Sequence, residues 1–197
     1  MLYLLDMAFF YALTPLEGFG ALIIFIHMDI VPATKKDLHA IISLVNSAYR
    51  GETAKKGWTH EADLIKGDLR IDEKMLTKLF DNPDSVILKA IDQSGEIVGC
   101  VYLEKKDITL YLGMLSVSPY KQASGIGKLL LKAADDYAKE KKCNTIEMTV
   151  ISVRKELINW YERNGYVNTR KVKPFAEDGR FGIPAKPIEF VVLEKIL

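Results

Sequence analysis

One segment of the sequence is suited to binding a phosphate-type anion. In SVSPYKQASGIGKLLL, Ser116 to Leu131, a proline ends an apolar run, small residues follow, and a helical pattern then begins. A helix N-terminus presents backbone N–H groups that have no helical partner, and the helix dipole adds partial positive charge. Gly125 and Gly127 have no Cβ, so a bulky anion can approach the backbone, and Lys128 adds a full charge. Pyrophosphate is the best-suited ligand.

Two other phosphate-binding motifs compete for this segment, and the spacing disfavours both. A Walker A loop needs Ser or Thr after Gly-Lys so that a hydroxyl reaches magnesium, whereas Leu129 follows Lys128 here. A dinucleotide-binding fingerprint starts directly after its strand, whereas residues 118–122 intervene here, and its third glycine position is Leu130. A nucleotide-dependent kinase or dehydrogenase is therefore a disfavoured class of function.

The same segment resembles motif A of the GCN5-related N-acetyltransferases (GNAT). Their pattern, Gln/Arg-x-x-Gly-x-Gly/Ala after a Val-x-Pro strand end, is filled by Gln122, Gly125 and Gly127. Downstream, LINWYERNGY is similar to a second signature of the family. Its matching positions are Tyr161, Glu162, Gly165 and Tyr166. The resemblance implies an α/β (α+β) fold with a mixed, mostly antiparallel sheet, a central βαβ acetyl-CoA-binding unit and helices on both faces. NSAYRGE and GWTHEADL resemble a bacterial and fungal subgroup, which leaves the substrate open.

The resemblance also implies acetyl-CoA as cosubstrate and no metal. In the family, the strand before motif A carries a bulge whose backbone pairs with the pantetheine arm, here Met114 to Val117, and the next strand diverges to open a V-shaped cleft. Arg154 stands where the family often has Asn, and an arginine there could still bind pantetheine or a phosphate. The implied cofactor-binding residues are Leu115, Ser116, Val117, Gln122, Ala123, Ser124, Gly125, Ile126, Gly127, Lys128 and Arg154.

Tyr161 holds the family position of the general acid that protonates the departing sulfur. A phenol with a pKa near 10 can do so at neutral pH. Without the family match, a tyrosine on one side of an amphipathic helix would be interpreted as a core residue. The general base stays open between a water chain and four side chains. These are His60, Glu61, Glu104 and Glu147.

The segment AYRGETAKKGWTHEADL falls where the first helices of the family line the acceptor pocket. Tyr49, Trp58 and Glu61 would form an aromatic and acidic cradle for a cationic amine, with Arg50 as counter-charge or carboxylate clamp. The alternative interpretation is that Tyr49 and Trp58 anchor a loop to the core.

The net charge of the chain disfavours some classes of binding partner. Lys and Arg number 27 against 26 Asp and Glu, so the chain exerts no bulk attraction on nucleic acid or anionic lipid. We expect acetyl transfer to a primary amine of a small molecule, by direct attack in a ternary complex. The alternatives are a peptide or protein amine as acceptor, or a non-catalytic acyl-CoA-binding regulatory module. Exposed strand edges make a homodimer possible.

The two cysteines, Cys100 and Cys143, form no CxxC pair and have no histidine at ligand spacing. They predict neither zinc nor a disulfide framework, and reduced thiols favour a cytoplasmic location.

The elements that position these residues form one domain, expected at residues 28–197. Residues 1–27 contain no Lys or Arg and resemble neither a secretory signal nor an uninterrupted membrane span. They are either a hydrophobic extension or translated sequence upstream of a start at Met28, and we favour the second.

Hydrophobic periodicity predicts helices after Thr34, over 72–82, from Ile126 onward and over 153–164. Residues 50–71 are expected to form a loop with at most short helical turns. Alternating apolar runs predict strands after Met28 and at 85–92, 96–106, 108–117, 144–151, 166–172 and 188–196. The run 108–117 is apolar on both faces, with Leu112 and Met114 on one face and Leu115 and Val117 on the other. It is therefore expected to be a central strand.

Overall fold

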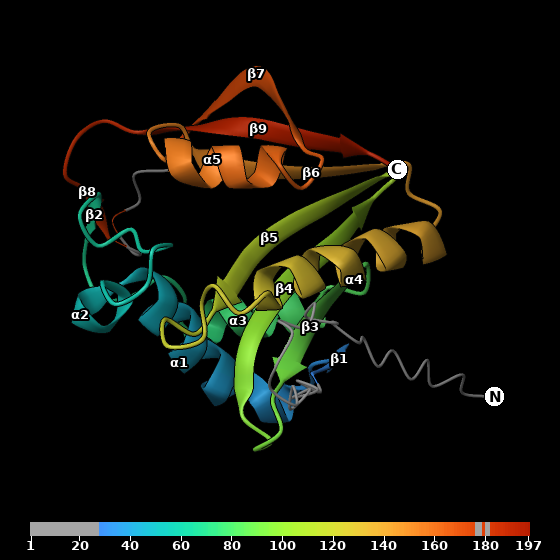
Figure 1. Ribbon diagram of the computed structural model, residues 1–197, viewed down its shortest axis with the longest axis horizontal. Coiled ribbons are helices and arrows are strands. Elements are labelled where there is room, and N and C mark those ends of the chain that lie inside the picture. The colour runs from blue at the N-terminus through green and yellow to red at the C-terminus, as the bar shows by residue number, and fades with distance from the viewer. Residues whose placement is uncertain (1–27, 176–178, 180–181) are drawn as a thin grey trace, which may run out of the picture.

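A seven-stranded sheet forms the centre of the protein (Figure 1), and its order is β1-β3-β4-β5-β6-β9-β7. The computed structural model describes residues 28–175, 179 and 182–197, so the expectations for residues 1–27 lie outside it. Every neighbouring pair of strands is antiparallel except β5 and β6. The strands are β1 Asp29–Pro32, β3 Ser85–Ile91, β4 Ile97–Lys106, β5 Thr109–Val117, β6 Thr145–Ile151, β7 Val167–Pro174 and β9 Glu189–Ile196. This arrangement confirms the mixed, mostly antiparallel sheet.

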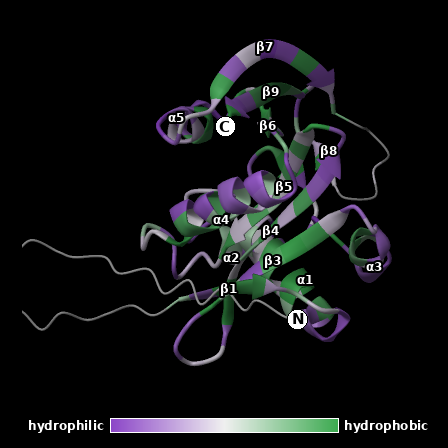
Figure 2. Ribbon diagram, turned by 90° about the vertical axis from the view of Figure 1, so that its right-hand side faces the viewer, coloured by the Kyte–Doolittle hydropathy of each residue, from purple (hydrophilic) through white to green (hydrophobic). Residues whose placement is uncertain are grey.

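Helices cover both faces of the sheet (Figure 2). α1 and α3 lie on one face, and α4 and α5 pack on the other. Each face encloses its own apolar core, and the larger core, beneath α4 and α5, includes residues of β3 to β6 and β9. The helices are η1 Lys35–Asp37, α1 Leu38–Tyr49, α2 Gly51–Ala54, α3 Glu73–Asp81, α4 Ile126–Glu140 and α5 Lys155–Glu162. The predicted helices are confirmed, because their apolar stripes match these two cores.

A bulge in β5 changes which side chains share a face. Cys100 pairs with Ser116 and Tyr102 pairs with Gly113, so two residues of β5 oppose a single residue of β4, and Met114 has a φ of 52°. The prediction of strict alternation is therefore wrong beyond Leu112. Met114 packs with the α1 side of the sheet, whereas Leu115 and Val117 pack on the α4 side with Leu112.

β5 and β6 are paired over only part of their length. The parallel register joins Thr109–Tyr111 to Thr145–Glu147, and beyond these residues the two strands diverge (Figure 1). A helical crossover through α4 connects them, which matches the central βαβ unit that the family resemblance implies. The divergence leaves an opening between the sheet's two halves.

The loop expected at residues 50–71 contains a strand that sequence analysis missed. β2, Ile65–Lys66, pairs with β8, Ile183–Pro184, in a separate two-stranded sheet. A two-residue strand has too few positions for an alternating pattern to be recognised. Its partner lies more than 100 residues away in the chain.

Candidate active site

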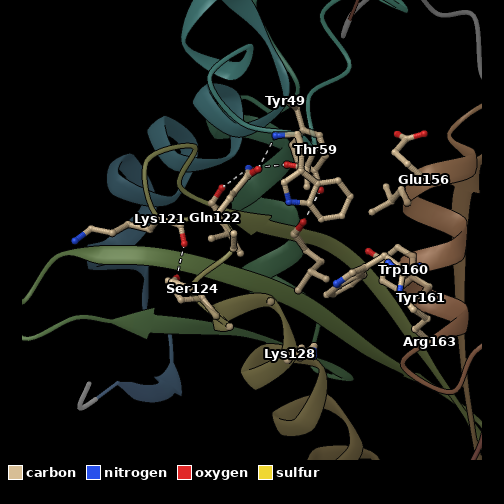
Figure 3. Close-up of a pocket in the computed structure, with 18 residues that line it drawn as sticks. Tyr49, Thr59, Lys121, Gln122, Ser124, Lys128, Glu156, Trp160, Tyr161 and Arg163 are labelled. Atoms are coloured by element: carbon tan, nitrogen blue, oxygen red, sulfur yellow. Dashed lines mark hydrogen bonds between the residues drawn. The ribbon is translucent and has the colours of Figure 1, made fainter. Parts of the chain in front are cut away.

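A cavity of about 610 Å³ lies between the N-terminus of α4 and the side of α5. We call it the motif cavity (Figure 3). It is lined by consecutive residues 121–128, by the end of β5, by Trp58 and Thr59, and by one side of α5. Its walls therefore bring the two signature segments of the sequence to the same space.

The backbone at the N-terminus of α4 is arranged to bind an anion. Gly125 has a φ of 88° and Ala123 a φ of 63°, a left-handed backbone that costs a non-glycine residue free energy. Within the described residues, the amide N–H groups of 122–128 donate to no protein oxygen, and Leu129 is the first to do so, to the Gly125 carbonyl at 3.1 Å. The side chains of Lys128 and Arg163 line the same space (Figure 3). The unpaired amides and cations favour a phosphate group here.

A glycine of α4 also faces α5 across the motif cavity. A Cβ on Gly127 would lie 3.4 Å from the ring of Trp160, which projects from α5 into the cavity. A larger side chain at this position would fill the space between the two helices.

The side chain of Gln122 joins motif A to the loop after α2. Its amide oxygen accepts a hydrogen bond from the Trp58 backbone N–H at 2.8 Å, and its amide nitrogen donates to Thr59 Oγ1 at 2.8 Å and to the Val117 carbonyl at 3.2 Å (Figure 3). The side chain is therefore engaged by the protein, and its backbone N–H is the part that remains open to a ligand.

Arg154 holds the same loop from the other side. Its buried guanidinium donates to the carbonyls of Trp58 at 3.2 Å, Thr59 at 3.1 Å and His60 at 3.0 Å, and it pairs with Glu156. These contacts occupy its donors, and it does not line the motif cavity. The geometry therefore does not favour the expected contact of Arg154 with the cofactor. We define Trp58–His60, held by Gln122 and Arg154, as the strap.

Ser116 also differs from expectation. Its side chain is buried, lines neither cavity, and donates to the Met114 carbonyl at 3.1 Å. It closes the bulge of β5 and leaves Leu115 and Val117 as the strand residues that face the motif cavity.

A second cavity, of about 220 Å³, lies in the opening between β5 and β6. We call it the strand cavity. Four residues line both cavities and mark the place where they meet. They are Tyr49, Leu115, Leu157 and Tyr161.

Tyr161 occupies this junction from α5. Only 6% of it is exposed, and its ring makes edge-to-face contacts with Trp160 at 4.9 Å and with Tyr166 at 5.7 Å between centroids. Burial, together with the neighbouring Tyr49, raises the pKa of its hydroxyl well above the ordinary value of 10. The phenol is therefore protonated at neutral pH and can donate a proton.

Tyr49 fixes the backbone of the bulge at the same junction. Its hydroxyl donates to the Leu115 carbonyl at 2.5 Å, and burial raises its pKa to about 12. This hydrogen bond connects α1 to the bulge of β5 at the junction of the two cavities.

The four residues expected to cradle the acceptor separate into different environments. Tyr49 lines both cavities, whereas Glu61 lines only the strand cavity and Trp58 only the motif cavity, where Trp58 contacts Trp160 edge-to-face at 6.2 Å. Arg50 is buried and forms an ion pair with Glu61 behind the cavity wall. The cradle of Tyr49, Trp58 and Glu61 is therefore not assembled as expected.

Sequence analysis missed several residues that line the strand cavity, because they come from distant elements. Arg70 follows β2, Tyr111 lies on β5, Thr149 on β6 and Phe190 on β9. Only the diverging strands bring them together. The available signal for Arg70 was a positive charge close in sequence to the aromatic residues of the acceptor segment. Nothing in its local sequence distinguished it from a surface arginine.

Among the four proposed bases, Glu61 alone lines the motif cavity or the strand cavity. His60 Nδ1 lies 4.0 Å from Asp63 Oδ2. Glu104 accepts a hydrogen bond from Asn82, and Glu147 pairs with Lys173. Glu61 is itself bound by Arg50.

Comparison with known proteins agrees with this geometry. The family model described as "Acetyltransferase (GNAT) family" matches residues 38–166. The chain belongs to this family. The GNAT match begins with α1 and ends at Tyr166, so it includes the N-terminus of α4, the diverging strands and α5.

Two curated relatives come from Bacillus subtilis. The N-acetyltransferase YhfO is 32% identical over 106 residues, 50% of this chain and 70% of YhfO. YdhI is 29% identical over 79 residues, 39% of this chain, and the match spans about half of YdhI, 47%.

Solved structures share the fold at low identity. YncA from Salmonella typhimurium, solved with its cofactor acetyl-CoA, has a TM-score of 0.63 and 18% identity, covering 87% of this chain and 94% of YncA. The ribosomal-protein-S18-alanine N-acetyltransferase of Escherichia coli has a TM-score of 0.64 and 14% identity, covering 86% and 93%. Nourseothricin acetyltransferase has a TM-score of 0.61 and 20% identity, covering 86% and 98%.

The described part of the chain contains no group of three or more His, Cys, Asp or Glu side chains suited to a metal ion. None of its helices has the length and apolarity that crossing a membrane requires.

Proposed function

We propose that this chain transfers the acetyl group of acetyl-CoA to a primary amine of a small molecule, by direct attack in a ternary complex. The observation that carries the proposal is the meeting of two cavities at Tyr161. The motif cavity has unpaired amides suited to a diphosphate, and the strand cavity reaches the same tyrosine from the opening between β5 and β6.

The motif cavity fits the cosubstrate. Amides of residues 122–128 would bind the pyrophosphate, with Lys128 beside them, and the backbone of Leu115 and Val117 would pair with the pantetheine arm. The volume of about 610 Å³ is within the range of about 300–1,000 Å³ that small-molecule sites usually have.

The chemistry requires a neutral amine and a proton for the leaving sulfur. A C–N bond forms as the C–S bond breaks, the amine loses one proton, and the thiolate gains one. Tyr161, kept protonated by burial, would supply the proton to sulfur. Glu61, or water beside it in the strand cavity, would accept the proton of the amine.

The size of the strand cavity favours a small acceptor. Its volume of about 220 Å³ is below the usual range of about 300–1,000 Å³ for drug-sized ligands. A peptide or protein amine is the second candidate, because one solved structure with this fold is a ribosomal-protein acetyltransferase. A homodimer, a cytoplasmic location and the assignment of residues 1–27 stay predictions.

Two measurements test the proposal. Thermal unfolding is measured with CoA, ATP and NAD added separately, and of the three only CoA should raise the Tm. Thiol release from acetyl-CoA should then accelerate with at least one small primary amine. Stabilisation by CoA without turnover on small amines or peptides would favour a regulatory acyl-CoA-binding module, and stabilisation by ATP or NAD alone would reject the assignment.

A further inference from the structure

We propose that the acceptor carries a carboxylate close to its amine and that Arg70 binds this carboxylate. The substrates would then be α-amino acids or amines of the same design. The inference rests on the proposed acetyl transfer and specifies its acceptor. The products would be CoA and an N-acetyl amino acid, with the amine nitrogen losing one proton and the sulfur of CoA gaining one.

The charges that line the strand cavity support an anionic group. Its lining contains one carboxylate, Glu61, and two guanidinium groups, Arg70 and Arg154. Glu61 is already paired with Arg50, and Arg154 is bound by Glu156 and by the carbonyls of the strap. The positive charge of Arg70 is therefore the one that the protein compensates least.

The contacts of Arg70 leave its hydrogen-bonding capacity for a ligand. Its Nε lies 3.9 Å from Glu61 Oε2, which is an ion-pair distance beyond hydrogen-bond range, and about a third of its side chain is exposed. A planar guanidinium with donors on one edge matches the two oxygens of a carboxylate.

The backbone of Arg70 is fixed with respect to the junction. Its N–H donates to Asn46 Oδ1 at 2.6 Å, and Asn46 Nδ2 donates to the Ile71 carbonyl at 3.0 Å, so α1 holds the chain here. The guanidinium lies 5.7 Å from the centroid of the Tyr49 ring, and the hydroxyl of that ring binds Leu115 at the bulge.

One tyrosine side chain therefore separates the proposed carboxylate site from the place where the two cavities meet. An acceptor bound by Arg70 would direct an amine a few bonds away toward the thioester. A long polyamine has no group for Arg70 and would bring further positive charge to it, so this class of acceptor is disfavoured.

The test compares amino acids with the amines that lack only the carboxylate. Leucine is paired with isoamylamine and phenylalanine with phenethylamine, and spermidine is added as a cationic acceptor. kcat/KM is measured for wild type, Arg70→Gln, Arg70→Lys and the matched control Arg170→Gln, since Arg170 is exposed and lines neither cavity.

We expect wild type to prefer the amino acid of each pair by about 10- to 100-fold, the range for hydrogen bonds to charged groups. Arg70→Gln should lose that preference, measured as the ratio of kcat/KM within each pair, Arg70→Lys should recover part of it, and Arg170→Gln should match wild type. A similar rate on both members of a pair, a better rate on spermidine, or an equal loss on both members in Arg70→Gln would overturn the inference alone. Failure of every acceptor would instead overturn the proposed transfer.

Discussion

The two cavities that meet at Tyr161 are built in different ways. The motif cavity contains one run of consecutive residues, 121–128, whose amides are unpaired within the described residues, and it is completed by the end of β5, the strap and α5. The strand cavity is formed by side chains from α1, β5, β6, α5, β9 and the segment around β2. In the proposed function, binding of the cofactor's diphosphate would therefore depend mainly on local conformation, whereas binding of the acceptor would depend on tertiary packing.

The largest expected effect is at the junction that both cavities share. We expect Tyr161→Phe to lower kcat by about 100-fold or more, the usual contribution of a general acid, with the KM for acetyl-CoA nearly unchanged. Because burial keeps the pKa of Tyr161 well above 10, the wild-type rate should show no decrease from its ionisation below pH 10.

Tyr166→Phe is the matched control, since Tyr166 contacts Tyr161 but lines neither cavity, and its buried hydroxyl has no hydrogen-bond partner among the described residues. Its kcat should equal that of wild type. Equal losses in both variants would indicate that Tyr161 acts through packing and not through proton donation.

The strap connects the regions around the two cavities, and Arg154→Lys tests how much Arg154 contributes to holding it. One ammonium cannot reproduce the fork of donors that reaches three carbonyls, so we expect the free energy of unfolding to decrease by about 1–3 kcal/mol. Urea denaturation gives this value, with Arg170→Lys as the exposed control. An unchanged midpoint would show that Gln122 alone is sufficient to hold the loop.

A pair of glycines separates backbone strain from cofactor binding. Gly125 and Gly95 have φ values of 88° and 82°, and at neither would a Cβ meet an atom within 4 Å. Alanine should therefore destabilise both by a similar amount, about 1 kcal/mol. Only Gly125→Ala should also raise the KM for acetyl-CoA, by several-fold, because Gly125 and the residues on either side of it line the motif cavity. If Gly95→Ala raised that KM equally, the local nature of the cofactor site would be disproved.

The smallest effect is expected at the start of α1, away from both cavities. The carboxylate of Asp37 accepts from the Thr34 N–H at 2.7 Å and from Lys89 at 2.7 Å. Asp37→Ala should lower the free energy of unfolding by about 1 kcal/mol without changing kcat. Asp81→Ala, which removes an exposed pair with Lys35, should cost less.

The contribution of Asp37 also has a defined pH dependence. Burial opposes its ionisation, but the hydrogen bonds from Lys89 and Thr34 outweigh burial, and its pKa falls below the ordinary value of 3.8. The stabilisation is therefore complete above pH 3.8 and is lost as the pH falls through the pKa of the folded state. Thermal unfolding of wild type and Asp37→Ala should converge in that acidic range.

The helix N-terminus after β5 could be predicted from sequence because its physics is local. The proline-ended strand, the glycines and the apolar stripe from Ile126 all lie within one short segment, and each acts on its immediate neighbours. The strands of the seven-stranded sheet and the longer helices followed from the same kind of periodic pattern, whereas β2 and β8 did not. The bulge at Met114 did not, because one extra residue in β5 is visible only against its pairing with β4.

The strand cavity was decided by the tertiary structure alone. Arg70 and Phe190 are 120 residues apart, and they share a wall only because β5 and β6 diverge beyond Tyr111. Packing likewise assigned Arg154 to the strap, where sequence analysis expected a ligand contact. It also paired Arg50 with Glu61, which fits a counter-charge, one of the two roles expected for Arg50. A local motif specifies backbone conformation, but which charged side chain is left for a ligand depends on the partners that folding brings to it.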